Sequence, residues 1–496
     1  MSHKPQKNHT LAIVILILLI IAMIAATGFV IWMCIDMVNV ESETTVPENT
    51  SIVLPTAETT PPTTMETEPA ETTVPPEPEH VVATATISSQ GDLLMHKPVF
   101  DTCRQSDGSY DFSSLFKYLK DTVSAFDYAA ANLETTFGGD DYPYQGNPTF
   151  NCPDPLANYL VDAGFDMLMT ANNHCSDTTA YGVKRTLEVV RGVGLDTVGT
   201  QLDAEEKKYT IAEVNGIKIG MICYTYATDV TSDGRPALNG LLPVAEVGLV
   251  NYFMNNNPGK MYEEVEQILM EMEAAGAEAS MMFIHWGVEY QTTENATQNA
   301  IAQKLCDLGI DVIVGGHPHV VQPVELLEST VDPEHRTVCI YSLGNAVSNQ
   351  RTGISNLVPA GYTEDGALFT VTFEKYSDGS VYLAGTDVLP TWVNMHQNNG
   401  PKEYNILPLD KEKEDQWQEM FQLTDHNFSS CQKSYDRTMG IVGEGLAACQ
   451  EYLAKEKIDR EQYYYDLAFF TERFVEETVA ETVAETYAEE TTLPAA

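Results

Sequence analysis

The amino-acid sequence predicts an α/β domain with two sheets and helices outside them, together with a membrane anchor ahead of that domain. Short apolar runs alternate with helical patterns from residue 81 to about residue 400, which is typical of strand–helix–strand units. Many of these runs end in Gly, Asn, His or acidic side chains. In α/β folds the carboxyl ends of the strands carry the ligand-binding residues. A functional site is therefore expected at one edge of a sheet.

The charge of the chain excludes some classes of partner. The 496 residues include 27 Lys and Arg against 72 Asp and Glu, a formal net charge of −45. Such a balance argues against nucleic-acid binding and against docking on anionic lipid. Residues 41–80 hold nine Glu and no Lys or Arg, and residues 471–496 hold seven Glu and one Arg. The central domain is therefore less acidic than the whole chain.

The N-terminal region has the pattern of a single membrane-spanning helix. Residues 11–35 carry no charge and are mostly Leu, Ile, Val, Ala and Met, and about 20 such residues cross a bilayer. A cleavable signal peptide is the alternative, but this run exceeds the ~7–15 residues of a signal core. Lys4 and Lys7 precede the run and Asp36 follows it. The positive-inside rule therefore predicts that residues 1–10 are cytoplasmic and that the main domain lies outside the cell membrane.

Two acidic segments are expected to be disordered. Residues 36–80 are rich in Thr, Pro and Glu, too polar for a core and too rich in proline for regular structure, so they predict an extended stalk. Residues 401–475 favour helix and predict a C-terminal extension. Residues 476–496 repeat Glu-Thr-Val-Ala in steps of four. A helix would stack Glu477 on Glu481 with mutual repulsion, so a solvated tail is predicted.

Between these tails, residues 81–400 carry the pattern of the α/β domain. Asn215-Gly216 is a strong hairpin signal, and a second hairpin is expected around Ser377-Asp378-Gly379. The expected helices are residues 261–275 and 296–308, with 113–121 and 155–163 helical or loop. The expected strands are residues 81–87, 127–132, 165–170, 210–214, 217–224, 280–284, the run that begins at 310, 337–342, 367–374 and 380–384.

Residues 310–323 hold the most informative motif. A run of five residues, apolar and β-branched except for Asp311, ends at Gly315-Gly316 and leads into His317 and His319, so a buried strand delivers two imidazoles to its carboxyl end. Glycine permits a sharp turn, and imidazole is a ligand that first-row metals prefer. A metal site is one interpretation. A pair of hydrogen-bonded loop histidines is the other.

Similar side chains follow other predicted strands. Asp92, Glu134, Asn173 with His174, and His285 each come after an apolar run. Each has an ordinary alternative when taken alone, as a turn, a helix cap or a structural histidine. In one sheet with one sense of winding, however, they would converge on the same edge.

Together these residues offer the ligand mixture of a two-metal hydrolase. Carboxylates, imidazoles and one amide suit Mn, Fe or Zn and contain too much nitrogen for calcium. Two divalent ions about 3.5–4 Å apart need a bridging carboxylate, and they activate water for hydrolysis. His174 is placed to act as a general acid or an electrostatic stabiliser. The candidate metal ligands are Asp92, Glu134, Asn173, His285, His317 and His319.

The nine cysteines do not form a recognisable metal or redox motif, since Cys-x-x-Cys spacing is missing from the sequence. Cys103 with Cys152, or Cys431 with Cys449, could form disulfides if the domain is exported.

Six sequence blocks follow one another along the predicted domain: residues 91–95 (GDLLM), 132–134 (NLE), 170–174 (TANNH), 285–290 (HWGVEY), 316–323 (GHPHVVQP) and 341–345 (YSLGN). In this order, over residues 81–390, they resemble the CapA family of poly-γ-glutamate capsule biosynthesis proteins. The resemblance implies an anchored extracellular domain, association with membrane subunits of a poly-γ-glutamate synthase, and export of the polymer.

That family is in turn similar to the calcineurin-like metallophosphoesterases, which implies a two-sheet α/β sandwich around two metals. Leu94 stands where those enzymes have a second ligand, and Asn172 where they have glycine. Carried over by motif, Asp92 and His319 hold one ion, Asn173, His285 and His317 hold the other, Glu134 bridges them, and His174 donates the proton.

Three functions follow as hypotheses. The first is a membrane-anchored CapA-type protein that acts in biosynthesis, export or trimming of an anionic polymer through a hydrolase site. The second is a non-catalytic polymer-binding or scaffold partner of a synthase complex, and the third is a plain phosphoesterase. A polyanionic substrate would need the metals or local cations such as Lys184, Arg185 and Arg351 to offset repulsion.

Overall fold

The computed structural model describes residues 78–230, 236–239, 242–243, 248–352, 361–397 and 401–490. These all belong to one compact unit, Val74–Ala496. The predicted membrane helix at 11–35 and almost all of the predicted stalk at 36–80 lie outside the described residues. Within the described part of the chain, no helix is long and apolar enough to cross a bilayer.

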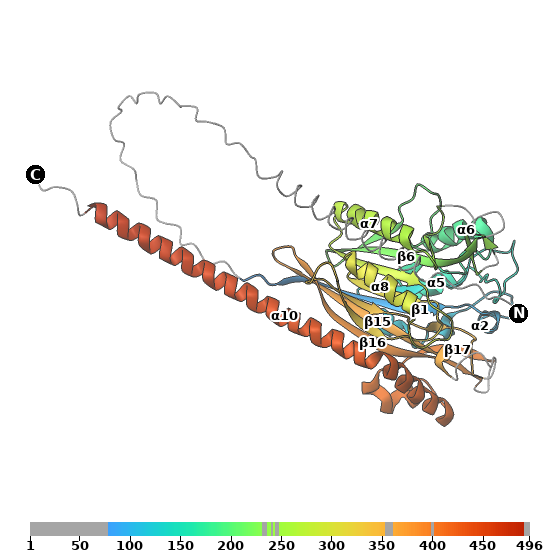
Figure 1. Ribbon diagram of the computed structural model, residues 1–496. Helices are drawn as coiled ribbons and strands as arrows, with labels where there is room; N and C mark the ends of the chain where they lie inside the picture. The colour runs from blue at the N-terminus through green and yellow to red at the C-terminus, as the bar shows by residue number, and fades with distance from the viewer. Residues whose placement is uncertain are drawn as a thin grey trace, which may run out of the picture. The chain divides into compact units, whose positions relative to one another are not determined.

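Two sheets form the centre of the domain (Figure 1). The first has the order β17-β16-β15-β1-β2-β3-β4, with β14 paired to β1. Strands β1 to β4 run parallel to one another, and β15 pairs with β1 in the antiparallel sense. Its strands are β1 (Val81–Leu93), β2 (Tyr128–Asn132), β3 (Met167–Met169), β4 (Asp196–Val198), β14 (Asn345–Val347), β15 (Asp365–Tyr376), β16 (Val381–His396) and β17 (Glu403–Pro408).

The second sheet has the order β12-β13-β11-β10-β6-β7-β8, and β5 and β9 also pair with β6. Its central strands β6, β10, β11 and β13 are parallel. Its strands are β5 (Tyr209–Val214), β6 (Ile217–Val230), β7 (Pro236–Leu238), β8 (Leu242–Pro243), β9 (Tyr252–Met254), β10 (Ala279–His285), β11 (Val312–Gly316), β12 (Val324–Glu328) and β13 (Arg336–Ile340).

The two sheets pack face to face, and helices cover their outer faces. Met281 and Phe283 of β10 join the core between the sheets, whereas the alternate Met282 and Ile284 pack with the outer helices. This alternation is expected of a strand buried on both faces. The first sheet is covered by α2 (Lys97–Thr102), α3 (Ser113–Phe116), α4 (Lys120–Val123), α5 (Leu156–Asp162) and α6 (Thr179–Gly192), and the second by α7 (Gly259–Ala274) and α8 (Ala296–Asp307).

The C-terminal part of the described chain is integral to this domain. Residues 403–408, expected in a helical extension, form edge strand β17 of the first sheet. Helix α10 (Asp425–Glu490) follows the short helices η2 (Lys411–Gln416) and α9 (Trp417–Met420), and contacts β12, β15 and β16, strands of both sheets (Figure 1). It continues to Glu490, into the stretch for which a disordered tail was predicted, because Glu and Ala favour helix despite the stacked charges.

The sequence patterns located most long elements. The two predicted hairpins are confirmed as β5–β6 and β15–β16, and Asn215 and Gly216 have the positive φ values, 52° and 82°, that a tight hairpin turn needs. All described cysteines are free and buried. Cys431 and Cys449 lie on the same helix about 27 Å apart at 1.5 Å per residue, so they cannot pair.

Candidate metal centre

The predicted site residues meet where the carboxyl ends of the two sheets face each other. Asp92 ends β1, Glu134 follows β2, and Asn173 and His174 follow β3, all in the first sheet. The other three histidines come from the second sheet: His285 ends β10, and His317 and His319 follow β11. The expectation that one sheet edge gathers all of them was wrong, because each of two parallel strand sets contributes its own edge.

The turn after β11 is held in an uncommon backbone conformation. His317 and His319 have φ values of 98° and 57°, which a side chain with a Cβ rarely adopts. A Cβ on Gly315 would lie 2.0 Å from the Tyr341 carbonyl oxygen, and one on Gly316 would lie 3.1 Å from Asp92 Oδ1. Strain of this kind clusters at functional sites. Here the strained backbone conformation directs the two imidazoles toward the first sheet.

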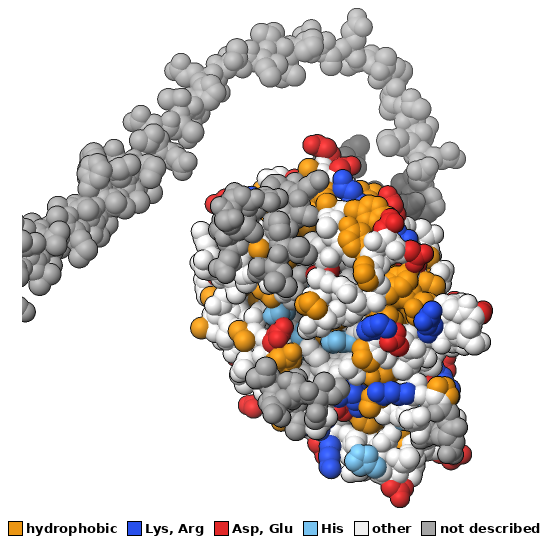
Figure 2. All heavy atoms as spheres, turned by 90° about the vertical axis from the view of Figure 1, so that its right-hand side faces the viewer, with side chains coloured by type: hydrophobic (Ala, Val, Ile, Leu, Met, Phe, Trp, Pro, Cys, Tyr) orange, Lys and Arg blue, Asp and Glu red, His pale blue; other side chains and the backbone are white. Residues whose placement is uncertain are grey.

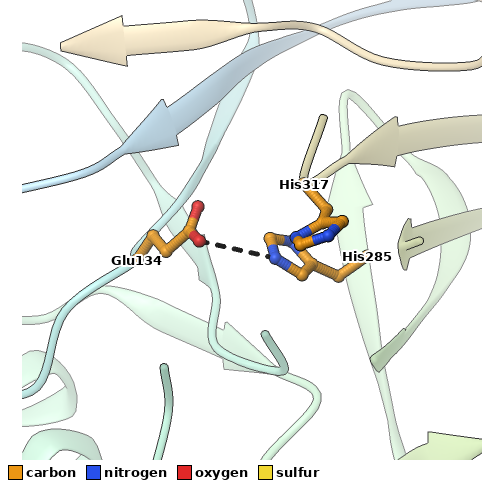
Figure 3. A group of neighbouring side chains, drawn as sticks. All are labelled: Glu134, His285 and His317. Carbon is orange, nitrogen blue, oxygen red and sulfur yellow. Dashed lines mark ion pairs between the residues drawn. The ribbon is translucent and has the colours of Figure 1, made fainter. Parts of the chain in front are cut away.

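Two buried groups of ligand atoms result, and they share Glu134. One group is Glu134, His285 and His317, and the other is Asp92, Glu134 and His319; within each group the ligand atoms lie within 4.8 Å of one another. Figure 3 shows Glu134 facing His285 and His317, with Glu134 Oε1 3.5 Å from His285 Nε2. The same oxygen is 3.9 Å from His319 Nε2. Glu134 thus lies between the two groups.

Two of these buried atoms are suited to binding a cation. Glu134 Oε1 and His317 Nδ1 have no hydrogen-bond partner among the described residues, and a buried polar atom without a partner costs about 1–3 kcal/mol or more. Oxygen and nitrogen donors in this mixture are those that Mn, Fe and Zn accept. The chemistry of the donor set therefore fits divalent metal ions.

The remaining ligand candidate, Asn173, lies against the first group. Its Oδ1 accepts a hydrogen bond from His285 Nε2 at 2.9 Å, so the amide oxygen faces the same space as the Glu134 carboxylate. Asn173 is 2% exposed. Asn173 therefore lies beside the group formed by Glu134, His285 and His317.

A layer of asparagines holds the carboxylates, and sequence reasoning did not assign it a role. Asn132 Nδ2 donates to Asp92 Oδ1 at 2.7 Å and to Glu134 Oε2 at 3.4 Å. Asn172 donates to Asn132 Oδ1, and its own Oδ1 accepts from the His174 backbone N–H. The Asn172 amide thereby links Asn132 to the turn that carries His174.

The charges in the site are mutually dependent. Burial alone would raise the pKa of Glu134, but His319 and His285 lower it well below its usual range. Burial alone would lower the pKa of His319, but Glu134 and Asp92 raise it to about 9. Burial holds the pKa of His317 well below its usual value. Without a metal at neutral pH, the site therefore holds an anionic Glu134, a protonated His319 and a neutral His317.

His174 lies beside the two groups and is oriented by an aspartate that the sequence analysis missed. His174 Nδ1 donates to Asp177 Oδ2 at 2.7 Å, and the Phe150 backbone N–H donates to the same oxygen. The Phe150 ring packs edge-on against the imidazole with centroids 4.5 Å apart. Nε2 is then the ring nitrogen left for a reacting group. The spacing Asn-His-x-x-Asp is the signal that could have identified Asp177.

The other positions noted in the sequence have structural roles. Leu94 is buried in the fold, and burial lowers the pKa of the nearby His96 to about 4. Arg185 pairs with Asp154, and Arg351 with Glu364, so neither is an unneutralised cation. Figure 2 shows one face of the molecule, on which lysine and arginine side chains lie beside acidic ones and histidine side chains are also visible.

Comparison with known proteins identifies the family. The family model described as bacterial capsule synthesis protein PGA_cap matches residues 86–350, more than half of the chain. The chain belongs to the PGA_cap family. The match begins in β1 and ends just after β14, so it contains all seven predicted site residues.

Two relatives carry the same capsule function in their names. The PGA_cap chain is 30% identical over 304 residues to the PGA biosynthesis protein CapA of Bacillus subtilis, covering 60% of this chain and 70% of the relative. It is 27% identical over 304 residues to the capsule biosynthesis protein CapA of Bacillus anthracis, covering 60% and 68%. The resemblance to the CapA family is thereby confirmed.

Among solved structures, the NAD nucleotidase NadN of Haemophilus influenzae is similar with a TM-score of 0.36 and 12% identity, covering 76% of this chain and 68% of NadN. Similarity at this level does not bear on function.

Proposed function

We propose that this protein is a membrane-anchored, extracellular hydrolase that acts on poly-γ-glutamate or a related anionic envelope polymer, in its biosynthesis, export or trimming. The observation that carries the proposal is Glu134, whose fully buried carboxylate belongs to both ligand groups and keeps one oxygen without a hydrogen-bond donor among the described residues. A shared carboxylate between two sets of ligands is the arrangement that a two-metal hydrolytic site requires.

The residues divide into two ligand sets and one proton donor. Asp92 and His319 would hold one divalent ion, and Asn173, His285 and His317 the other, with Glu134 between them. When bound, such ions polarise the bond to be cleaved and lower the pKa of water. This arrangement supports a two-sheet sandwich of the metallophosphoesterase type.

The chain's own proton chemistry lies at His174. Asp177 accepts a hydrogen bond from the Nδ1–H group of His174 and fixes the ring orientation. Nε2 is therefore the atom that delivers a proton to the leaving group. The Asp177 side chain is only 5% exposed, and burial raises the pKa of its carboxyl group. Its hydrogen bonds from His174 and from the Phe150 backbone keep the acceptor in place.

The cellular setting belongs to the same proposal. The uncharged run at residues 11–35 and the polar segment at 36–80 support a single-pass anchor that holds the domain outside the membrane on an extended stalk. Membrane subunits of a poly-γ-glutamate synthase are the partners that the CapA relationship suggests, and the anionic polymer is the substrate.

Turnover measurements on the metal-loaded chain test this function. The purified chain in detergent would be loaded with Mn²⁺ and assayed on γ-glutamyl peptides and on phosphoesters, with His174→Ala as the test variant. The exposed His426 provides the matched control His426→Ala. Cleavage of γ-glutamyl bonds that His174→Ala abolishes and His426→Ala leaves intact is expected. Cleavage of phosphoesters alone would make the protein a phosphoesterase, and bound metal without any turnover would favour a polymer-binding role.

A further inference from the structure

Asn239 lies outside every sequence motif but contacts two residues of the site. It follows β7, and the two residues before it, Ala237 and Leu238, are buried. Its Oδ1 accepts a hydrogen bond from Asn173 Nδ2 at 2.6 Å. Its Nδ2 lies 3.4 Å from His174 Nδ1 and 3.3 Å from His174 Nε2. A residue of the second sheet therefore reaches the strand-end turn of the first.

The contact with His174 is a stacking contact. Nearly equal distances to both ring nitrogens place the Asn239 amide nitrogen over the ring face, because an in-plane position equidistant from both would collide with Cε1. Phe150 packs edge-on against the same imidazole. Asn239 also has φ of 53°, a left-handed conformation that asparagine tolerates better than most residues. Its amide is thus held by packing and backbone geometry together.

The contact with Asn173 decides which atom of that amide faces the ligand groups. An asparagine amide presents either an acceptor oxygen or a donor NH₂ group, and only the oxygen binds a cation. Because Asn239 Oδ1 engages Asn173 Nδ2, Asn173 Oδ1 turns toward His285 Nε2 and the Glu134 carboxylate. Without that acceptor the NH₂ group is free to rotate toward the cation.

We infer that Asn239 is a positioning residue that holds the carbonyl oxygen of Asn173 toward a divalent ion bound by His285 and His317. This deepens the proposed function and rests on its metal centre, but it does not depend on which bond the site cleaves. The role matches that of outer residues around metal sites, whose loss costs roughly 10–100-fold in metal affinity.

Two substitutions at one position test the inference. Mn²⁺ binding to the full chain in detergent would be measured by calorimetry, with electron paramagnetic resonance to detect coupling between two ions. Asn239→Ala is expected to weaken the second binding step about 10–100-fold and to leave the first unchanged. Asn239→Asp keeps an acceptor for Asn173 Nδ2, so it is expected to bind both ions with nearly the affinity of the unmodified chain. The exposed Asn158→Ala on α5 is the matched control.

A double-mutant cycle separates orientation from a general loss of structure. In an Asn173→Asp background either side-chain oxygen faces the ion, so Asn239→Ala is expected to cause no further loss of affinity. Equal losses in both backgrounds, or full affinity in Asn239→Ala alone, would overturn the inference while leaving the hydrolase proposal standing. If the unmodified chain bound no Mn²⁺, both would be overturned. Two bound ions without hydrolysis would overturn the proposed function only.

Discussion

At the scale of single residues, the site is a set of buried charges that compensate one another. Asp92 and Glu134 are fully buried, and buried carboxylates require either cationic partners or a metal. His319 supplies the positive charge without a metal, since its Nδ1 lies 3.0 Å from Asp92 Oδ2. A divalent ion bound by His319 must therefore displace a proton from its imidazole. The ion then supplies the positive charge that the proton supplied before.

The His319 proton gives opposite pH dependences with and without metal. The pKa of His319 is raised to about 9 in the fold, above its ordinary value of 6.5. Its ion pair therefore stabilises the metal-free fold fully below about pH 6.5, and this contribution is lost as pH rises through 9. Metal affinity should rise over the same interval, because binding releases the proton.

Denaturant unfolding at pH 6.5, 7.5 and 9, with chelator and with Mn²⁺, checks this prediction. The stabilisation added by Mn²⁺ should grow across the series while the stability of the chelated protein declines. A metal-induced stabilisation that shrank with rising pH would contradict the assignment of the proton to His319.

Asp177 is predicted to act through His174. Replacing His174 by Ala should lower kcat by about 10²–10⁴-fold, the usual contribution of a general acid. Asp177→Asn removes the charge that orients the Nδ1–H group of His174, so a smaller fall in kcat is expected, with Mn²⁺ affinity unchanged in this variant. A normal kcat in Asp177→Asn, or loss of metal in it, would show that Asp177 has another role.

The sequence indicated that seven candidate site residues would lie close together, because each follows a strand and belongs to a recognisable block. It did not reveal the asparagines that orient them. Asn132 and Asn172 lie within the blocks but look like ordinary turn residues, and Asn239 has no local signal, since only the pairing of β6 with β7 carries it to the site. Hydrogen-bond partners distant in sequence depend on the tertiary structure.

At the scale of elements, helix α10 forms hydrogen bonds with the segment that leads into β15, close to the candidate metal site. Arg437 of α10 donates to both oxygens of Asp365 at the start of β15, at 2.6 Å each, and to the Gly361 carbonyl. The neighbouring Thr363 carbonyl accepts from Asn345 Nδ2, which also donates to the His319 carbonyl. The C-terminal helix and the His319 turn therefore brace the same short segment.

Arg437→Ala should destabilise the fold in a pH-dependent way. Asp365 is 2% exposed, and removing one partner of a buried ion pair costs about 3–5 kcal/mol. Burial already raises the pKa of Asp365 to about 7 despite Arg437, and loss of the arginine raises it further. In the unmodified chain the Asp365 carboxyl is therefore mostly neutral at pH 5, where its ion pair with Arg437 contributes little, and mostly charged at pH 8, where the pair contributes fully.

Unfolding free energies of the unmodified chain and of Arg437→Ala at these two pH values check the prediction. The difference between the two proteins should be large at pH 8 and clearly smaller at pH 5. An equal difference at both values would indicate that packing, not charge, is what Arg437 contributes.

Most long elements were predictable from sequence, although helix α6 was not, and of the described three-residue strands only β3 was predicted. Strands β10 and β11 read as continuous apolar runs because both of their faces are buried. Three-residue strands such as β9 and β14 have too little pattern to detect. Residues 403–408 sit next to helix-favouring sequence and become a strand only because β16 offers a free edge.

At the scale of the whole molecule, the site exists because two parallel strand sets point their carboxyl ends at a common space. Asp92 and His319 are 227 positions apart in the chain, and local patterns do not reveal that separate sheets will face each other. The alternation of strands and helices predicted two sheets. It did not predict that the metal ligands would divide between them.

The net charge of −45 makes ionic strength a variable of substrate binding. A polyanionic substrate is repelled by an acidic protein, and the Debye length shortens from about 10 Å at 0.1 M salt as salt is added. The KM for long poly-γ-glutamate should therefore fall several-fold between low and moderate salt while kcat stays constant. A short γ-glutamyl peptide amide with little charge is the control. A KM that rises with salt would reveal a cationic substrate groove instead.

The stoichiometry of bound metal tests the central claim most directly. After loading with Mn²⁺ and removal of excess ion, elemental analysis should find two ions per chain, and Glu134→Gln should lose both, because its carboxylate is common to the two ligand groups. His426→Ala should retain two. A chain that binds no divalent ion, or a Glu134→Gln variant that binds as much as the unmodified protein, would contradict the account.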